Sequence, residues 1–456
     1  MSDARRPLVG FDDRGRVFDA GEFILRVPHP ARREQTLALL ERYQAGHFED
    51  LGIVETELAA GDELALRHRK LTISYPFEWP ADMLKDAALF HLQLLSELAL
   101  RGLTLKDALP GNVLFEGARP VFVDFFSLVP IVSLADEQWL IGTSKGRQPW
   151  QLVMERMFFP YFVVPLLAMA AADYPDARKM LAVRACNCSG AAPSWKDLLT
   201  HFRALLRYAA LRGTLRGNVF TDVVKQLRTM LPTLDVTPRT SAYLGYYAAK
   251  KEEFDLDDRA QWQAKQTSMD AILAATKPAT VLDLGANTGW FSRLAVRHGA
   301  RVIATDIDEA AIDDLYLRAR NEGLSILPLR LSFEELSRVV PCPAAEGMFL
   351  PATERLQSDL VCCLGLLHHL VLGEGRSLAQ VLDVLSTLMH RTLAIEMIAL
   401  DDPLVRENPS FFPMLQQTAP AAYNLDALLE AGRSIFRTAT VMESHPSTRA
   451  IVVFEK

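Results

Sequence analysis

The stretch that most constrains the fold of this chain is VLDLGANTGWFSRLAVRHGARVIATDID, residues 281–308. An apolar run leads to two glycines, Gly285 and Gly289, and then to a helix-like run and a second apolar run that ends in Asp306. Glycine permits the backbone conformations of a tight strand-to-helix turn, and its missing side chain lets a ligand approach the main chain closely. The pattern therefore predicts a strand, a turn, a helix and a second strand that together bind a nucleotide.

Two details of this stretch indicate which kind of nucleotide fits. The turn reads Gly-Ala-Asn-Thr-Gly, which lacks the G-x-G-x-x-G spacing that places a pyrophosphate on a helix N-terminus. An acid, Asp283, lies inside the first strand, where it would oppose a pyrophosphate but would help hold a cationic amine. A second acid, Asp306, is placed to accept hydrogen bonds from both hydroxyls of a ribose. These features favour an adenosyl sulfonium ligand with an ammonium group over a dinucleotide.

The same residues resemble those of a known family. VLDLGANTGWFS resembles motif I of class I S-adenosylmethionine-dependent methyltransferases, and VIATDID resembles the acidic motif that follows it. LVCCLGLLHHL is similar to the fourth-strand motif, and the closing segments FRTATVMES and TRAIVVFEK resemble the reversed last strand of that fold. The resemblance covers roughly residues 240–456. It implies an α/β fold with a seven-stranded Rossmann-like sheet, an antiparallel last strand and S-adenosyl-L-methionine as cofactor.

The resemblance also implies roles for single residues. The first turn would line the methionine portion of the cofactor, Asp306 would bind the ribose, and Ile307 would pack on the adenine. Ser332 and Phe333 would meet the adenine edge, where many relatives carry an aspartate instead of a serine. The expected cofactor-binding residues are Asp283, Gly285, Ala286, Asn287, Gly289, Asp306, Ile307, Ser332, Phe333, Leu364 and Gly365.

Candidates for catalysis follow the fourth and fifth strands. His368 and His369 lie where the family places catalytic or substrate-contacting residues, and a neutral imidazole could deprotonate an acceptor. The alternative is that one histidine caps the following loop. Glu396 ends the strand TLAIEM, at the sheet edge where open α/β folds bind ligands, although a solvent-facing role is also open. In the segment before the sheet, Tyr243, Tyr247 and Lys265 either contact the substrate or pack in a core.

The chain divides near LPTLDVTPRT, residues 231–240, where prolines and threonines interrupt two helical stretches. We predict an α+β accessory or substrate domain over residues 1–235 and an S-adenosylmethionine-binding domain over residues 236–456. Short apolar strands alternating with helices in the second domain predict a parallel sheet covered on both faces. Its expected strands are residues 279–284, 301–306, 325–331, 359–366 and 392–397, followed by a hairpin of 436–444 and 448–456.

A second resemblance lies in the N-terminal half, in LKDALPGNVLFEGARPVFVDFFS. Asp107, Asn112 and Asp124 are spaced as in kinase-fold phosphotransferases, where such residues orient a hydroxyl and hold magnesium. A glycine-rich phosphate loop and a lysine with a partner glutamate are missing upstream. We therefore interpret residues 1–235 as a kinase-like remnant that binds substrate or acts as a scaffold. The two-part layout also resembles bacterial methyltransferases of the rhizobial nodulation-protein type.

Composition narrows the possible partners. The 456 residues carry a formal charge of −7, which argues against a chain that coats nucleic acid or an anionic membrane. Five scattered cysteines predict neither a disulfide framework nor a metal site, and the N-terminus lacks a secretory apolar run. The apolar segment at 157–172 contains Pro160 and Pro165 and is expected to form a buried helix pair broken by proline. We expect a cytoplasmic protein with a small-molecule acceptor.

The sequence thus predicts a methyltransferase that acts on an O-, N- or S-nucleophile of a small molecule or biosynthetic intermediate. Three alternatives stay open at this point. The first is an enzyme that uses the same cofactor without methyl transfer, in a cyclisation that releases methylthioadenosine. The second is a phosphotransferase that works from Asp107, Asn112 and Asp124, and the third is a binding module that keeps the cofactor pocket without catalysis.

Overall fold

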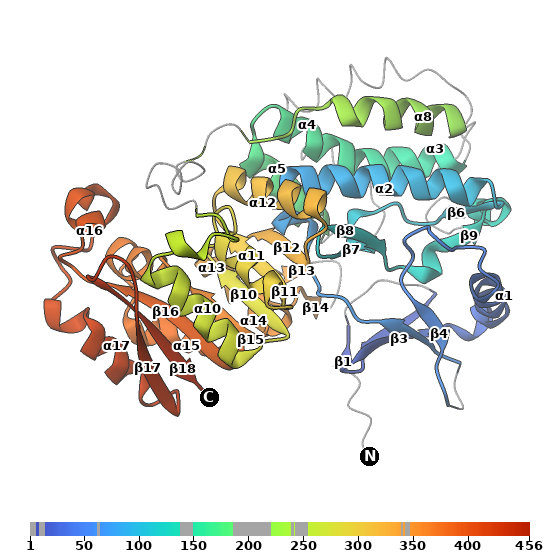
Figure 1. Ribbon diagram of the computed structural model, residues 1–456. Coiled ribbons are helices and arrows are strands. Elements are labelled where there is room, and N and C mark those ends of the chain that lie inside the picture. Colours follow the sequence, from blue (N-terminus) through green and yellow to red (C-terminus); the bar gives the residue numbers. More distant parts are fainter. Residues whose placement is uncertain are drawn as a thin grey trace. The chain divides into compact units, whose positions relative to one another are not determined.

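The structure is a computed structural model that describes residues 6–8, 14–61, 64–136, 149–185, 220–238, 241, 254–338, 341–342 and 347–456. The chain forms two compact units (Figure 1). The first consists of Met1–Pro238 together with Val339–Phe349, and the second consists of Arg239–Arg338 and Leu350–Lys456. A short piece of chain from the second half therefore belongs to the first unit.

The first unit begins with an antiparallel five-stranded sheet in the order β1-β2-β3-β5-β4. The strands β2 and β3 form a hairpin, with Phe18 opposite Leu25. A helix, α1 (Arg33–Gln44), follows β3 and precedes β4. The bounds of the strands are β1 Arg6–Pro7, β2 Gly15–Asp19, β3 Phe23–Pro28, β4 Thr56–Leu58 and β5 Leu66–Arg69.

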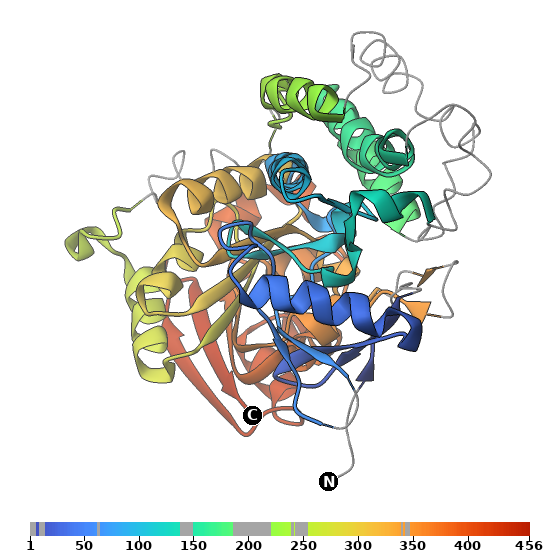
Figure 2. The ribbon, with the colours of Figure 1, turned by 90° about the vertical axis from the view of Figure 1, so that its right-hand side faces the viewer.

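The rest of the first unit is mainly helical. The helix α2 (Ala81–Ala99) carries a fully buried apolar face and packs beside α8 (Phe220–Met230); Figure 2 shows α2 nearly end-on. Two short antiparallel pairs follow α2, and the second is a hairpin that turns at Gly117. Their bounds are β6 Leu103–Leu105 with β9 Leu128–Pro130, and β7 Val113–Glu116 with β8 Arg119–Phe122.

The apolar segment with two prolines differs from its prediction. Instead of a helix pair broken by proline, α3 (Pro149–Val153), a π-helical stretch Met154–Val163 and α4 (Val164–Ala170) follow one another directly, and α5 (Tyr174–Ala185) comes next. Pro160 lies inside the π-helical stretch. Proline lacks an N–H and clashes with the carbonyl four residues earlier, and the wider π-helical turn accommodates both defects. No helix in the described part of the chain is long and apolar enough to cross a membrane.

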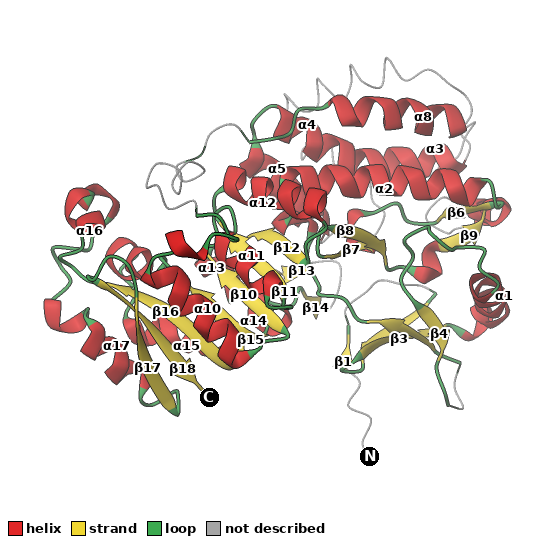
Figure 3. Cartoon of the chain, viewed as in Figure 1, coloured by secondary structure: helices red, strands yellow, loops and turns green. Residues whose placement is uncertain are grey.

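The second unit contains a seven-stranded sheet in the order β12-β11-β10-β15-β16-β18-β17 (Figure 3). The strands from β12 to β16 pair in parallel, whereas β18 pairs antiparallel with both of its neighbours. This confirms the predicted mixed sheet with a reversed last strand. The strands are β10 Thr280–Leu284, β11 Arg301–Asp306, β12 Ile326–Arg330, β15 Ser358–Cys363, β16 Met389–Ile398, β17 Thr438–Glu443 and β18 Arg449–Glu455.

Helices cover this sheet because its central strands are mostly apolar and almost wholly buried, as β10 and β15 show. The helix α10 packs on α11, and α15 packs on α14 and α17. The helices are α10 Ala264–Thr276, α11 Trp290–Arg297, α12 Glu309–Glu322, α13 Phe333–Leu336, α14 Ala352–Arg355, α15 Leu378–Leu388, α16 Pro403–Glu407 and α17 Leu425–Gly432.

Part of the connection between β12 and β15 belongs to the first unit. Two short strands, β13 (Pro341–Cys342) and β14 (Gly347–Met348), pair antiparallel and are followed by Phe349. The Phe349 ring lies 4.6 Å from the Tyr75 ring and 5.7 Å from the Phe77 ring, measured between centroids. This aromatic cluster belongs to the first unit, whereas α13 and α14, in the same connection, belong to the second.

Candidate active site

The turn after β10 adopts the backbone conformation that its glycines predict. Gly285, Asn287 and Gly289 have φ angles of +69°, +51° and +76°, a region that glycine enters freely and asparagine tolerates. The amides of Gly285 and Ala286 both donate to the carbonyl oxygen of Thr305 on β11, at 2.8 and 2.9 Å. These bonds tie the turn to the neighbouring strand, so that its main chain faces the carboxyl end of the sheet.

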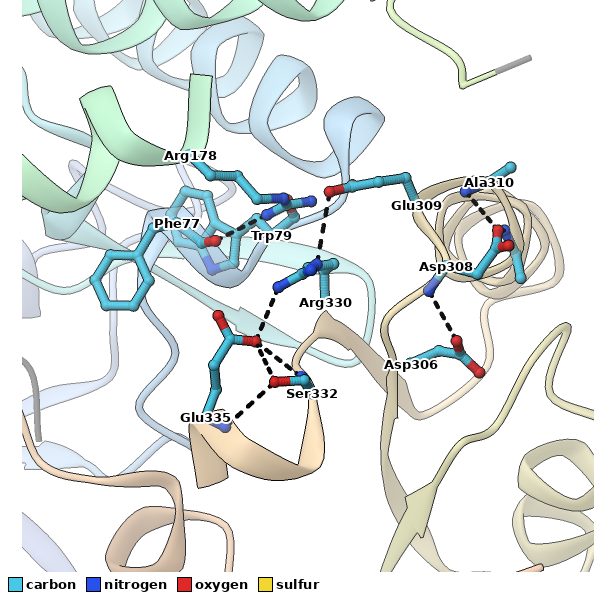
Figure 4. Close-up of polar contacts among 11 residues, drawn as sticks. Phe77, Trp79, Arg178, Asp306, Asp308, Glu309, Ala310, Arg330, Ser332 and Glu335 are labelled. Atoms are coloured by element: carbon cyan, nitrogen blue, oxygen red, sulfur yellow. Dashed lines mark hydrogen bonds and ion pairs between the residues drawn. The ribbon is translucent and has the colours of Figure 1, made fainter. Parts of the chain in front are cut away.

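The acid at the end of β11 is held by main-chain amides (Figure 4). Asp306 accepts a hydrogen bond from the Asn287 amide at 2.7 Å and another, through its second oxygen, from the Asp308 amide at 2.8 Å. Burial raises the pKa of Asp306, and the hydrogen bonds of these two amides oppose that rise. Each carboxylate oxygen keeps a second lone pair, so the group can still accept two hydroxyl donors.

The residue after this acid is an exposed apolar side chain. Ile307 keeps 53% of its surface exposed, whereas most large apolar residues of the second unit are buried. An apolar surface beside a carboxylate fits a ligand that combines a flat heterocycle with a sugar diol. The predicted adenine contact of Ile307 stays a prediction that this placement permits.

Asp283 lies beneath the turn instead of on its open side. Its side chain is 3% exposed, and the Ser292 hydroxyl of α11 donates to it at 2.6 Å. Burial raises the pKa of Asp283 to about 6, an effect that the Ser292 hydrogen bond opposes. The carboxylate therefore joins β10 to the first turn of α11, and its predicted contact with the cofactor ammonium stays untested.

Ser332 takes part in a helix cap (Figure 4). Its hydroxyl accepts from the Glu335 amide at 3.3 Å, while its own amide and hydroxyl donate to the Glu335 carboxylate, both at 2.9 Å. Arg330 also binds this carboxylate, at 2.8 Å. Both polar groups of Ser332 are thus engaged at the start of α13, and Phe333 is 7% exposed. The adenine-edge role predicted for these two residues stays a prediction.

The fourth strand ends earlier than predicted because the chain turns at Gly365, where φ is +65°. A Cβ atom at this glycine would lie 3.9 Å from the Glu396 carboxylate of β16, and one at Gly285 would lie 3.6 Å from Leu366. The turns after β10 and β15 are therefore neighbours, as their parallel pairing requires. Leu364 is 7% exposed beside them.

Glu396 is the centre of a buried polar group. Its side chain is fully buried, and its two oxygens accept from the Lys265 ammonium at 2.7 Å and from the Ser444 hydroxyl at 2.6 Å. Lys265 lies on the first turn of α10 and is 14% exposed. This contradicts the alternative that Glu396 faces solvent, and it brings the predicted residues Lys265 and Glu396 together.

The two histidines occupy different environments. His368 is 1% exposed, and neither of its ring nitrogens has a hydrogen-bond partner among the residues that the structure describes. Its ring lies 4.2 Å from the His369 ring and 5.4 Å from the Phe412 ring, between centroids. Burial, with His369 nearby, holds the pKa of His368 well below its ordinary value, so the imidazole is neutral at pH 7. His369 is half-buried, and burial also lowers its pKa.

Three residues near the histidines and Glu396 were missed by sequence reasoning. Ser444 comes from the turn of the terminal hairpin, and Phe412 and Tyr423 come from the connection between β16 and β17. Phe412 and Tyr423 are 2% and 1% exposed. No motif marks these positions, because tertiary folding brings them to the sheet edge. Tyr243 and Tyr247, which were predicted to contact substrate, lie outside the described residues.

The candidate phosphotransfer residues of the first unit are already paired. Arg26 of β3 binds Asp124 at 2.8 Å, and Lys106 binds the adjacent Asp107 at 3.4 Å. The Asn112 side chain donates to the Asp107 carbonyl oxygen at 3.0 Å. Among the described residues, no group of three or more histidine, cysteine or acidic side chains could hold a metal ion. The predicted kinase-like character of this unit stays a prediction.

The geometry of the second unit fits S-adenosylmethionine. An open glycine turn, a carboxylate held for a sugar diol and an exposed apolar side chain follow one another along two adjacent strands. Residues 282–389 match a family model described as a methyltransferase domain. The second unit is therefore an S-adenosylmethionine-dependent methyltransferase domain, and S-adenosylmethionine is its cofactor.

Over a longer stretch the chain is similar to the nodulation protein NoeA of Rhizobium meliloti (strain 1021). The two are 28% identical over 425 residues, which span 84% of this chain and 80% of the relative. Because the second unit makes up less than half of the chain, this similarity extends into the first unit.

Solved structures with lower similarity include three methyltransferases. Magnesium protoporphyrin IX methyltransferase from Synechocystis PCC 6803 is 16% identical, over 42% of this chain and 79% of that one, with a TM-score of 0.28. The N-methyltransferase NodS from Bradyrhizobium japonicum WM9 is 12% identical, over 44% and 99%, with a TM-score of 0.29. The bifunctional kinase-methyltransferase WbdD is 18% identical, over 50% and 45%, with a TM-score of 0.31. Similarity at this level does not define a shared substrate.

Proposed function

We propose that the second unit transfers a methyl group from S-adenosylmethionine to a hydroxyl group of a small-molecule acceptor, with His368 as the general base. The cofactor supplies an electrophilic methyl carbon bonded to a sulfonium sulfur. The observation that supports the proposal most directly is the buried His368 imidazole, both of whose nitrogens lack partners among the described residues. A buried polar group without a partner is costly unless a ligand supplies one.

The surroundings of His368 favour a hydroxyl over an amine. The buried Phe412 ring lies 5.4 Å from the His368 ring, and an ammonium ion would lose its hydration in this buried site at a high free-energy cost. A hydroxyl enters uncharged and must lose its proton as it attacks the methyl carbon. The neutral imidazole of His368 can accept that proton, whereas the Glu396 carboxylate is already occupied by Lys265 and Ser444.

The protein residues have separate tasks in this reaction. Asp306 and the turn at Gly285 fix the adenosyl group, while His368 accepts the proton that the acceptor loses. Alignment of the two reactants accounts for up to roughly 7–11 kcal/mol of barrier lowering in favourable cases. Proton removal by a placed base adds a factor of roughly 10²–10⁴.

The test compares His368→Gln with His369→Gln. Each purified variant is given methyl-labelled S-adenosylmethionine and a low-molecular-weight extract of the source cells, and labelled products are separated by chromatography. We expect His368→Gln to bind S-adenosylhomocysteine normally by calorimetry but to lose methyl transfer about 100-fold or more. Unchanged transfer in His368→Gln would contradict the base assignment. Release of methylthioadenosine instead of S-adenosylhomocysteine would contradict methyl transfer itself.

We also propose that residues 1–235 form an accessory domain that serves the same reaction instead of a separate phosphotransferase. The similarity to NoeA spans both parts of the chain, which supports a common role for them. The ion pairs at Asp107 and Asp124 support the absence of a magnesium-dependent activity, because both carboxylates are already neutralised.

A further inference from the structure

We propose that the ion pair between Lys265 and Glu396 is an exchange site for the amino-acid end of S-adenosylmethionine. On binding, the Lys265 ammonium takes the cofactor carboxylate, and the Glu396 carboxylate takes the cofactor ammonium. The ion pair of the free protein is thereby replaced by two ion pairs with the ligand. This inference rests on the proposed use of the site for S-adenosylmethionine and adds the residues that recognise its charged end.

The Lys265–Glu396 pair lies at the edge of the sheet where the cofactor is proposed to bind. The Lys265 ammonium lies 5.3 Å from the centroid of the Phe291 ring, at the start of α11, and it acts electrostatically on Asp283 at the end of β10. Its partner Glu396 lies beside Gly365, where a Cβ atom would come within 3.9 Å of the carboxylate. The pair therefore lies close to the turn after β15 and to the start of α11. Asp306, which is placed for the ribose, binds the other side of the first turn.

Both members of the pair have hydrogen-bonding capacity that the described residues do not use. Within the described part of the chain, Lys265 donates one hydrogen bond, to Glu396, although an ammonium has three donors. Glu396 accepts one bond at each oxygen and keeps further lone pairs. Each member can thus begin to bind a ligand group of opposite charge before the bond between Lys265 and Glu396 is broken.

The charges of the pair match those of the amino-acid end of the cofactor. The methionine portion of the cofactor is a zwitterion, and a lysine–glutamate pair is its complement in charge. A buried ion pair contributes little to stability, since desolvation offsets the attraction between its members. A pair of this kind at the edge of a ligand-binding sheet is therefore better explained by recognition than by stability.

Asp283 is a poorer partner for the cofactor ammonium than Glu396. The Ser292 hydroxyl of α11 donates to the Asp283 carboxylate at 2.6 Å, and burial raises the pKa of Asp283 to about 6. Glu396 instead lies next to Gly365, a position without a side chain, so the main chain leaves room for a ligand group beside the carboxylate. The exchange thus assigns to Glu396 a role that the sequence suggested for Asp283.

Calorimetric titration with two ligands tests the exchange. S-adenosylhomocysteine carries both charges of the amino-acid end, whereas its decarboxylated analogue, S-adenosyl-3-thiopropylamine, keeps only the ammonium. We expect Lys265→Met to lower the affinity for S-adenosylhomocysteine at least tenfold and to change the affinity for the analogue less than threefold. We expect Glu396→Gln to lower the affinity for both ligands, because both carry the ammonium group.

Matched variants keep the test decisive. Lys277→Met removes a lysine at the end of the same helix and is expected to leave both affinities unchanged. Lys265→Arg keeps the charge and is expected to restore most of the discrimination between the ligands if Lys265→Met does not fold. Equal weakening of both ligands in a folded Lys265→Met protein would overturn the exchange. Failure of the unaltered protein to bind S-adenosylhomocysteine would instead contradict the proposed function.

Discussion

Gly289 is held by two independent constraints, its backbone conformation and its neighbour. Its φ angle is +76°, and a Cβ atom would lie 2.4 Å from the Leu315 side chain of α12. We predict that Gly289→Ala lowers the free energy of unfolding by about 1–2 kcal/mol for the left-handed backbone and about 1–3 kcal/mol for overpacking. Urea denaturation measures the sum. Gly323→Ala is the control, because Gly323 has a φ of +65° and no atom within 4 Å of its Cβ position.

The raised pKa of Asp283 has a consequence for stability. Its carboxyl titrates at about 6 in the folded chain and at 3.8 when unfolded, so raising the pH from 3.8 to 6 destabilises the fold. At about 1.4 kcal/mol per tenfold change in proton affinity, the cost is at most about 3 kcal/mol. We predict that Asp283→Asn unfolds at higher urea concentration than the unaltered protein at pH 8, with the difference disappearing near pH 4. The exposed Asp383→Asn should show no such pH dependence.

The lowered pKa of His368 makes the stability of the fold change with pH in the opposite direction. Its pKa is lowered by burial, so the unfolded chain binds a proton that the folded chain does not, and stability falls as the pH drops below about 6.5. We predict that His368→Gln loses less stability than the unaltered protein between pH 7 and pH 5, by thermal unfolding. Equal losses in both proteins would show that the imidazole is not kept neutral by burial.

The conformation and contacts of a residue were predictable from the sequence where its partners are close to it along the chain. The roles of Gly285 and Gly289 follow from one short segment, because a strand-to-helix turn dictates them locally. The partners of Glu396 were not predictable, since Lys265 and Ser444 come from segments on either side of it that meet only in the folded sheet. The same limit applied to the hydrogen bond between Asp283 and Ser292, which no sequence motif marks, while the predicted cofactor contact of Asp283 stays a prediction.

At the scale of the element, the start of α12 links helix stability to Asp306, the carboxylate predicted to bind the ribose. Asp308 caps this helix by accepting from the amides of Ala310 and Ala311, both at 3.0 Å, while its own amide donates to Asp306. We predict that Asp308→Ala lowers the free energy of unfolding by about 1 kcal/mol, because the cap is lost. Asp308→Ser should recover most of that loss. Since the backbone amide stays in both variants, the affinity for S-adenosylhomocysteine should fall less than tenfold.

The elements of the second unit were largely predictable because their hydrophobic periods are strong. The alternation of apolar runs and amphipathic segments is a local signal, and the reversed β18 followed from the position of the terminal hairpin. The π-helical stretch around Pro160 was not predictable in the same way. Proline usually ends a helix, and only the packing of the buried residues around it decides whether the chain continues through a wider turn.

At the scale of the whole molecule, the two units differ in how their charged residues are satisfied. In the second unit, Lys265 and Glu396 keep unused donors and lone pairs beside an open glycine turn. In the first unit, Asp124 already has the Arg26 guanidinium at 2.8 Å, and Asp107 has Lys106 at 3.4 Å. A magnesium ion would have to displace a guanidinium that also binds the Val123 carbonyl oxygen.

We therefore predict that only one of two ligands stabilises the full chain. S-adenosylhomocysteine at 100 times its dissociation constant should add about 2.7 kcal/mol to the unfolding of the second unit, whereas magnesium with ATP should leave the calorimetric transitions unchanged. Two variants serve as controls. Asp306→Ala should lose the stabilisation by S-adenosylhomocysteine, and Asp124→Asn should retain it. A magnesium-dependent shift that disappears in Asp124→Asn would show that the carboxylate exchanges Arg26 for the metal, and residues 1–235 would then be a nucleotide-binding domain in their own right.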